Sequence, residues 1–160
     1  MNPQGAWKDE RGFTLIEVMV TIIVMGIVLG IASSTWFKMA ESRRVDSATN
    51  QVVADLRLAH TQATNRLTYT TFVVPSADSS TYQVGPPEDP DDLETRTLPG
   101  DDEGTPKTKI LADTTITFNS DGSAEINPAG DITVTVASID GDPSHTIEIN
   151  PVTSRVKIVS

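Results

Sequence analysis

The fold of this chain is decided by the stretch RGFTLIEVMVTIIVMGIVLGIA, which occupies residues 11–32. The 20 residues from Phe13 to Ala32 carry a single charge, on Glu17. A helix rises about 1.5 Å per residue, so a helix of this length matches the ~30 Å hydrocarbon core of a bilayer. The sequence therefore predicts a membrane-spanning helix over residues 13–32.

Glu17 is out of place in a simple membrane anchor. Inserting a carboxylate costs about 2.5 to 3.5 kcal/mol of free energy at the centre of a bilayer and less near its edge. Anchoring alone does not offset that cost. We therefore expect Glu17 to have a partner of opposite charge.

The junction at residues 11–18 resembles the class III leader junction of type IV pilins and type II secretion pseudopilins. The resemblance implies a leader over residues 1–12, cut between Gly12 and Phe13 by prepilin peptidase, a membrane aspartyl protease, and N-methylation of the new terminal Phe13. Gly12 suits such a site because a residue without a side chain lets the backbone enter a narrow cleft. The resemblance also gives Glu17 its partner, the α-ammonium group of Phe13 on a neighbouring subunit.

Two other interpretations of the apolar run remain open. Basic residues before an apolar run also describe a secretory signal peptide, with Gly30-Ile31-Ala32 as its cleavage site, although this run is longer than the usual 7 to 15 residues and contains a glutamate. A plain signal anchor is the second. Gly26 and Gly30 could form a small-residue packing face between helices, but glycine is also common in membrane helices.

Length and charge bound what the rest of the chain can be. Removal of the leader leaves 148 of the 160 residues, enough for one helical stalk and one small domain. The net charge of -10 argues against a large basic surface for nucleic acid. The chain has no cysteine, so no disulfide stabilises it.

The helix is expected to continue over residues 33–67 as an amphipathic helix. Trp36 and Phe37, followed by Lys38, Arg43 and Arg44, suit a membrane interface. The apolar positions then recur at spacings of three and four, as in a helix that packs one face on a sheet: Val45, Ala48, Val52, Leu56, Ala59, Ala63 and Leu67.

From Thr68 to the C-terminus the apolar period changes to two, which predicts half-buried antiparallel strands. The expected strands are 68–74, 81–84, 107–111, 114–118, 124–126, 131–137, 145–149 and 155–159. Turn residues separate them at 119–122, 140–143 and 150–153. The fold class is therefore α+β: a long N-terminal helix packed on a C-terminal antiparallel sheet or sandwich head over residues 68–160.

The end of the chain resembles a narrower group, the GspH/FimT-type pseudopilins. Residues 116–123 read ITFNSDGS and residues 147–156 read IEINPVTSRV, close to the F-x-x-D-G and I-x-I-x-x-x-T-G-R-V patterns of that group. Ser154 stands where the group usually has glycine, and serine would be strained if the turn needs a positive φ.

Residues 86–106 form an acidic, proline-rich segment, predicted to be a loop without core or ladder. It holds five of the ten prolines and eight carboxylates against one base, Arg96. A Ca²⁺ site or a partner-docking loop is one interpretation. A solvated mobile insertion is the other, and it is favoured because no EF-hand spacing is present.

The sequence offers little for catalysis, and we expect no enzyme, no cofactor and no metal site. His60 and His145 have no cysteine, G-x-S-x-G or H-E-x-x-H motif beside them. The expected function is that of a minor pseudopilin: a single-pass inner-membrane subunit with its head in the periplasm or outside, assembled through its helix into a type II secretion pseudopilus or type IV pilus.

Its expected partners are other pilins or pseudopilins, prepilin peptidase, the inner membrane before assembly and a secreted substrate. Two alternatives remain: a FimT-like DNA-uptake pilin, which needs a cationic patch beyond Arg155 and Lys157, and a bitopic membrane protein that never polymerises.

Overall fold

The computed structural model describes residues 12–86, 92–101, 103–127 and 130–159. It contains two compact units, divided between Lys38 and Met39. The expected leader, apart from Gly12, lies outside the described residues.

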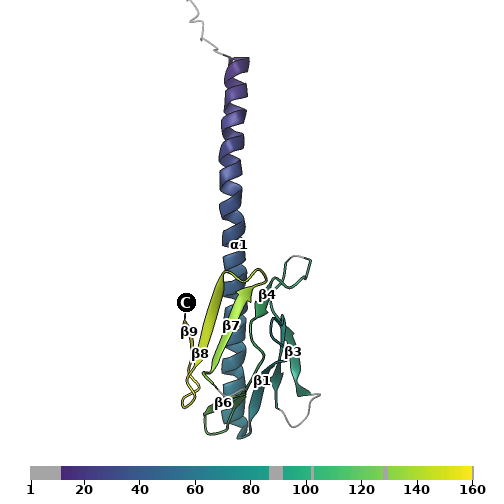
Figure 1. The fold of residues 1–160 in the computed structure, drawn as a ribbon, viewed down its shortest axis with the longest axis vertical. Coiled ribbons are helices and arrows are strands. Elements are labelled where there is room, and N and C mark those ends of the chain that lie inside the picture. Colours follow the sequence, from purple (N-terminus) through teal and green to yellow (C-terminus); the bar gives the residue numbers. More distant parts are fainter. Residues whose placement is uncertain (1–11, 87–91, 102, 128–129, 160) are drawn as a thin grey trace, which may run out of the picture. The chain divides into compact units, whose positions relative to one another are not determined.

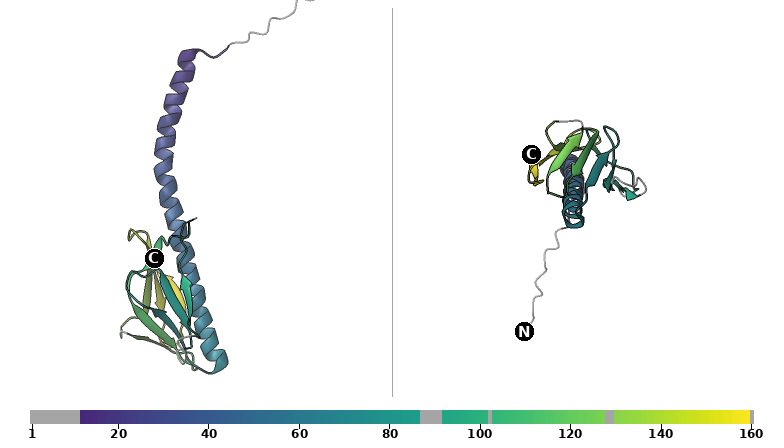
Figure 2. Two further views of the ribbon diagram at one scale, coloured as in Figure 1. Left: turned by 90° about the vertical axis from the view of Figure 1, so that its right-hand side faces the viewer. Right: turned by 90° about the horizontal axis from the view of Figure 1, so that it is seen from below.

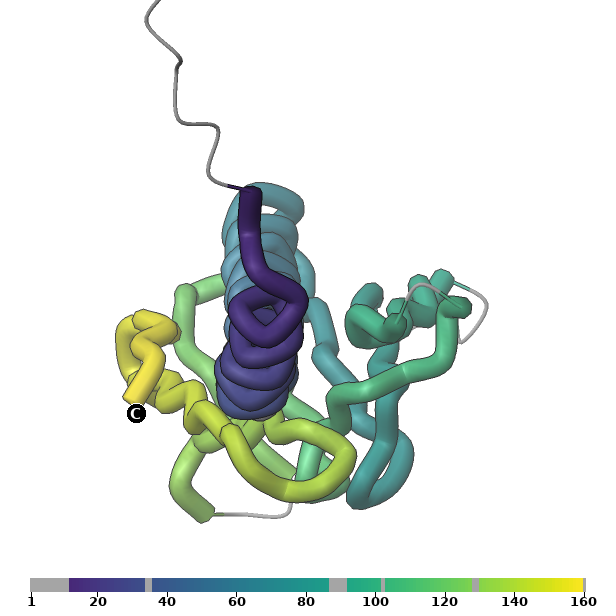
Figure 3. Tube along the Cα trace, turned by 90° about the horizontal axis from the view of Figure 1, so that it is seen from above, coloured from purple at the N-terminus to yellow at the C-terminus, as the bar shows by residue number. Residues whose placement is uncertain are grey.

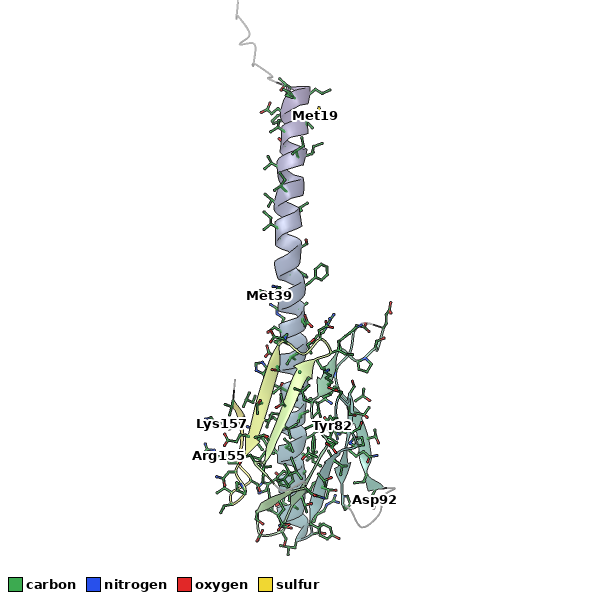
Figure 4. All side chains as sticks on the ribbon, viewed as in Figure 1. Met19, Met39, Tyr82, Asp92, Arg155 and Lys157 are labelled. Atoms are coloured by element: carbon green, nitrogen blue, oxygen red, sulfur yellow. The ribbon has the colours of Figure 1, made fainter. Side chains whose placement is uncertain are left out.

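One helix, α1, runs over Leu15–Arg66 and belongs to both units. Its first part contains an 18-residue window with a mean hydropathy of 2.6, long and apolar enough to cross a membrane. Every large apolar side chain from Phe13 to Ile31 is exposed, and Figure 4 shows the side chains around Met19 projecting outward from the helix. A surface of this kind is stable only when lipid or other helices cover it.

The second part of α1 carries the predicted buried stripe. Its six positions from Val45 to Ala63 are fully buried. The seventh, Leu67, differs from the prediction, because it is 81% exposed and has a φ of 52°. The backbone N–H of Thr68 donates to the carbonyl of Ala63 at 3.2 Å, the six-to-one bond of a Schellman cap. Leu67 therefore ends the helix as its left-handed cap residue.

In the part of the chain that the structure describes, nine strands follow α1, and all their pairs are antiparallel. They form a five-stranded sheet with the order β3-β2-β1-β5-β6 and a four-stranded sheet with the order β4-β7-β8-β9 (Figure 1). Their bounds are β1 Thr70–Val74, β2 Thr81–Gly85, β3 Glu94–Thr97, β4 Thr108–Ile110, β5 Thr114–Phe118, β6 Ala124–Asn127, β7 Thr133–Ser138, β8 Ser144–Ile149 and β9 Val156–Val159. The α+β fold class is confirmed.

A single apolar core holds the second unit together. From Met39 onward α1 lies alongside the strands (Figures 1 and 2). The core takes side chains from α1 and from both sheets, and its largest members are fully buried: Leu56, Phe72, Tyr82, Phe118, Ile116 and Ile147. Burying such a side chain stabilises a fold by about 1.5 to 3 kcal/mol, so the helix fixes the two sheets against one another.

The acidic segment 86–106 is more ordered than predicted where the structure describes it. Glu94 to Thr97 form β3, which pairs with β2 in the register Tyr82↔Arg96, and Leu98 is 2% exposed in the core. The prediction of a segment without ladder or core is therefore wrong for residues 94–98. Threonines favour a strand there, and a partner edge on β2 supplies hydrogen bonds that the sequence does not reveal.

Candidate functional site

The predicted processing site lies at the start of α1. Gly12 is exposed, and beyond its chain neighbours no described atom lies within 4 Å of a Cβ placed on it. Phe13 is 81% exposed. Both residues therefore lie outside the helix and are accessible in the chain as described.

Glu17 lies in the first turn of α1. Its backbone N–H donates to the Thr14 hydroxyl oxygen at 3.3 Å and to the Thr14 carbonyl at 3.1 Å, which makes Thr14 the N-cap and Glu17 the third helical residue. Thr14 and Glu17 have the spacing of a capping box, and a carboxylate in the first turn is stabilised by the helix dipole. This local role was not predicted, although the T-x-x-E spacing signals it.

The two C-terminal motifs meet in space. The Ser154 hydroxyl donates to the Gly122 carbonyl at 2.7 Å, and the Ala124 N–H donates to the Pro151 carbonyl at 2.8 Å. Ser154 is 4% exposed with a φ of 51°, so the turn does use the left-handed conformation that glycine would favour. The hydrogen bond from the serine hydroxyl to a neighbouring carbonyl offsets part of this backbone strain.

The turn at 119–123 also packs against α1. The His60 ring meets Phe118 edge to face with centroids 6.0 Å apart. A Cβ placed on Gly122 would lie 3.6 Å from His60 Nε2. Within the turn, the Ser123 hydroxyl donates to Asp121 at 2.7 Å and lowers the pKa of that carboxyl. His60 is thus a packing residue of this junction.

A buried polar network that was not predicted from the sequence joins α1 to β2 and β3. Asp55 is 4% exposed and accepts hydrogen bonds from the Tyr82 hydroxyl at 2.5 Å and from Arg96 Nη1 at 2.8 Å. Gln51 Nε2 donates to the same Tyr82 hydroxyl at 3.0 Å. Burial and the bond to Asp55 raise the pKa of Tyr82 above its ordinary range. The only sequence signal is a carboxylate set between the stripe residues.

Arg96 also binds Glu94 through Nη2 at 2.9 Å, a bond that raises the pKa of the guanidinium. The one base of the acidic segment is therefore held by two carboxylates, Asp55 and Glu94. Because Asp55 is on the helix, the guanidinium that bridges these two carboxylates attaches β3 to α1.

A cationic groove lies between α1 and β9. Two adjoining cavities of about 720 Å³ and 550 Å³ share Arg57 and Arg155 in their walls, and Lys157 lines the larger one. Glu148, opposite Lys157 in the strand register, is the one carboxylate among the described residues that lines the groove. None of the three cations forms an ion pair with any residue in the described ranges.

The second histidine, His145, makes a contact between elements. His145 Nε2 lies 2.8 Å from Asp46 Oδ1 and links β8 to α1. Among the described residues no group of three histidines or carboxylates is arranged to hold a metal ion. Glu88, Asp89, Asp91 and Asp102 of the acidic segment lie outside those residues.

Comparison with known proteins yields two family matches. Residues 7–33 match the prokaryotic N-terminal methylation motif. Residues 48–153, which are 106 of the 160 residues, match the type II transport protein GspH. No curated protein and no solved structure is significantly similar to the chain.

Proposed function

The chain belongs to the family of the type II transport protein GspH, and we propose that it is a minor pseudopilin of a type II secretion pseudopilus or a type IV pilus. The family is one of structural pseudopilins, and the methylation motif and the apolar helix suit a membrane-anchored subunit of a fibre. One observation carries the proposal: a methylation motif, an exposed apolar helix and a GspH-type head follow one another in a single chain.

In this proposal the leader is removed between Gly12 and Phe13, and Phe13 becomes the N-methylated terminus. The anchor, residues 13–32, holds the subunit in the inner membrane, with the head in the periplasm or outside. The amphipathic helix 33–67 and the head 68–160 are then carried into the fibre. The anchor has an exposed apolar surface, and this surface can pack against the helices of other subunits.

In the proposal, Glu17 sets how neighbouring helices align along their axes in that bundle. Its carboxylate pairs with the α-ammonium group of Phe13 on a neighbouring subunit. An unpaired charge in an apolar bundle is costly, on the order of 3 to 5 kcal/mol, so a subunit out of register is disfavoured. The capping position of Glu17 is an additional, local role, worth about 0.3 to 1 kcal/mol.

Two substitutions at Glu17 separate these roles. Glu17→Gln keeps a side chain that a capping box accepts but removes the charge, whereas Glu17→Val removes both. Thr21→Val, one turn further along the exposed helix, is the matched control, because it changes polarity without changing charge. Leader cleavage, membrane retention and crosslinking to partner pseudopilins are measured in the same cells.

We expect both Glu17 variants to be cleaved and retained but to lose crosslinked assemblies, while Thr21→Val assembles normally. Normal assembly of Glu17→Gln with failure of Glu17→Val would show that the cap, and not the ion pair, is what assembly needs. Normal assembly of both would favour a bitopic anchor that never polymerises.

A further inference from the structure

The cationic groove between α1 and β9 is bordered by a free strand edge. Among the described residues β9 pairs only with β8, so it ends the four-stranded sheet. Figure 3 shows this C-terminal strand at one side of the head, and in Figure 4 Arg155 and Lys157 lie on that same side. A free strand edge presents unpaired N–H and C=O groups to a partner.

The strand register indicates which backbone groups of β9 are free. The Asn150 N–H donates to the Arg155 carbonyl at 3.0 Å, at the start of the ladder between β8 and β9. Hydrogen-bonded and non-hydrogen-bonded positions alternate along an antiparallel ladder. Lys157 is therefore at a bonded position, and Ile158, opposite Ile147, is not. The N–H and C=O of Ile158 face away from β8, so a partner strand can bind there without breaking a bond of the head.

The groove beside this edge is cationic in an acidic chain. Arg57 on α1 and Arg155 and Lys157 beside and on β9 are exposed, and among the described lining residues they face one carboxylate, Glu148. The chain as a whole has a net charge of -10. Ile158 is 41% exposed on the same edge. The edge and the groove are therefore suited to an extended segment that carries carboxylates.

The same features favour a peptide over a nucleic acid. None of the described residues that line the larger cavity has an aromatic ring on which a base could stack. The net charge of -10 repels a long polyanion, whereas a short acidic strand carries few charges. A peptide also has the backbone groups that a free strand edge can bind, and a nucleic acid has none.

We propose that the β9 edge and the cationic groove bind an extended acidic segment of a different subunit of the same fibre. The segment adds a strand to β9, and its carboxylates lie against Arg57, Arg155 and Lys157. The inference rests on the proposed function, because a minor subunit has other subunits as its neighbours. Exposed ion pairs are weak and are screened by salt, so a partner held in the same fibre, at a high effective concentration, is favoured over a freely diffusing protein.

A first experiment tests the chemistry of the groove with defined peptides. The full chain in detergent micelles is titrated with a short labelled peptide of alternating glutamate and valine. The matched peptides are one of alternating lysine and valine, and the glutamate peptide with every backbone nitrogen methylated. Arg57→Glu reverses a cation of the groove, and Arg43→Glu reverses an exposed cation on the same helix that lines neither cavity.

We expect the glutamate peptide to bind at least fivefold more tightly than the lysine peptide, and its affinity to fall with added salt. Methylation of the peptide should weaken binding at least fivefold, because strand addition needs the peptide N–H groups. Arg57→Glu should weaken binding to the same extent, whereas Arg43→Glu should leave it unchanged. Equal binding of the glutamate and lysine peptides, or of the methylated and unmethylated ones, would overturn the inference, as would tighter binding of an oligothymidine.

A second experiment identifies the partner in cells that make the whole fibre. A photoreactive benzophenone amino acid replaces Val159, an exposed residue at the end of β9. The matched control carries it at Ser120, an exposed position on the turn between β5 and β6. The same amino acid at Ile16, on the exposed apolar helix, reports helix bundling. Mass spectrometry identifies each product and the crosslinked segment.

We expect position 159, and not position 120, to crosslink an acidic segment of another protein that carries an N-terminal methylation motif. Lysines in place of the carboxylates of that segment should reduce the product at least fivefold. Arg57→Glu and Lys157→Glu in this chain should then restore it, because the charges are exchanged.

The crosslinks distinguish failure of this inference from failure of the proposed function. Loss of the product from position 159 while the product from Ile16 persists would overturn the inference and leave the proposed function intact. A product with a protein that has no methylation motif, such as a secreted substrate, would overturn the choice of partner. Loss of the product from Ile16 in the otherwise unsubstituted chain would refute the proposed function, and with it this contact.

Discussion

Ser154 shows how a single residue departs from a family pattern without breaking the turn. Its φ of 51° is a conformation that costs a residue with a side chain about 1 to 2 kcal/mol. Its hydroxyl, however, satisfies the carbonyl of Gly122 in a buried position, a bond worth about 1 kcal/mol. The two effects nearly cancel.

Substitutions at Ser154 should separate the backbone strain from the hydroxyl hydrogen bond. Ser154→Gly relieves the backbone and loses the bond, so we expect a free energy of unfolding within about 1 kcal/mol of the original. Ser154→Ala keeps the strain and loses the bond, and it should cost about 1 to 2 kcal/mol. Urea denaturation measures both. An alanine variant as stable as the glycine variant would contradict this account.

Gly12 is expected to matter for leader removal and not for the stability of the fold. A Cβ at this position would contact no described atom beyond its chain neighbours. Gly12→Val is therefore expected to leave the structure unchanged but to block leader removal, because valine crowds the scissile bond in the protease. Intact mass of the membrane form measures processing, and Gly130→Val, equally open, is the control. Normal processing of the Gly12 variant would refute the cleavage site.

At the scale of elements, β3 is held by more than its ladder with β2. Its Arg96 reaches Asp55 on α1, and Leu98 just beyond it enters the core. Helix and edge strand are thus joined by an ion pair, by the 3.1 Å bond from Gln51 Nε2 to the Thr97 carbonyl and by an apolar anchor, which explains why an acidic, proline-rich segment contains an ordered strand.

Removing that ion pair should loosen β3. Arg96→Ala leaves the Asp55 carboxylate buried with Tyr82 alone, so we expect a loss of about 2 to 3 kcal/mol, less than for a fully buried pair because the Arg96 side chain is 30% exposed. Glu94→Ala removes the other partner of the same guanidinium, at 68% exposure, and should cost under about 1 kcal/mol. Equal costs in urea denaturation would contradict an anchoring role for Asp55.

At the scale of the whole molecule, the two units make different demands on their surroundings. Every residue of the core cluster lies between Ala48 and Val156, inside the second unit. The first unit has exposed apolar side chains throughout its described helix. One unit can fold in water, whereas the other needs lipid or a helix bundle.

Residues 39–160 produced alone should therefore fold. We expect a single cooperative thermal transition by circular dichroism, because the core is complete without the anchor. Leu56→Ala, at a fully buried position, should lower the free energy of unfolding by about 2 to 5 kcal/mol. A gradual transition, or no effect of Leu56→Ala, would show that the head depends on the anchor.

The sequence by itself determined the features that are local or periodic. The apolar run, the stripe from Val45 to Ala63 and the alternation along β5 and β7 follow from contacts between residues a few positions apart, and each is in the structure. The family resemblance follows from short motifs of the same kind. Only the tertiary structure decided which distant segments meet: Ser154 with Gly122, Asp55 with Arg96, and the groove that Arg57 shares with β9. Such pairs depend on the order of strands across two sheets, which no local spacing encodes.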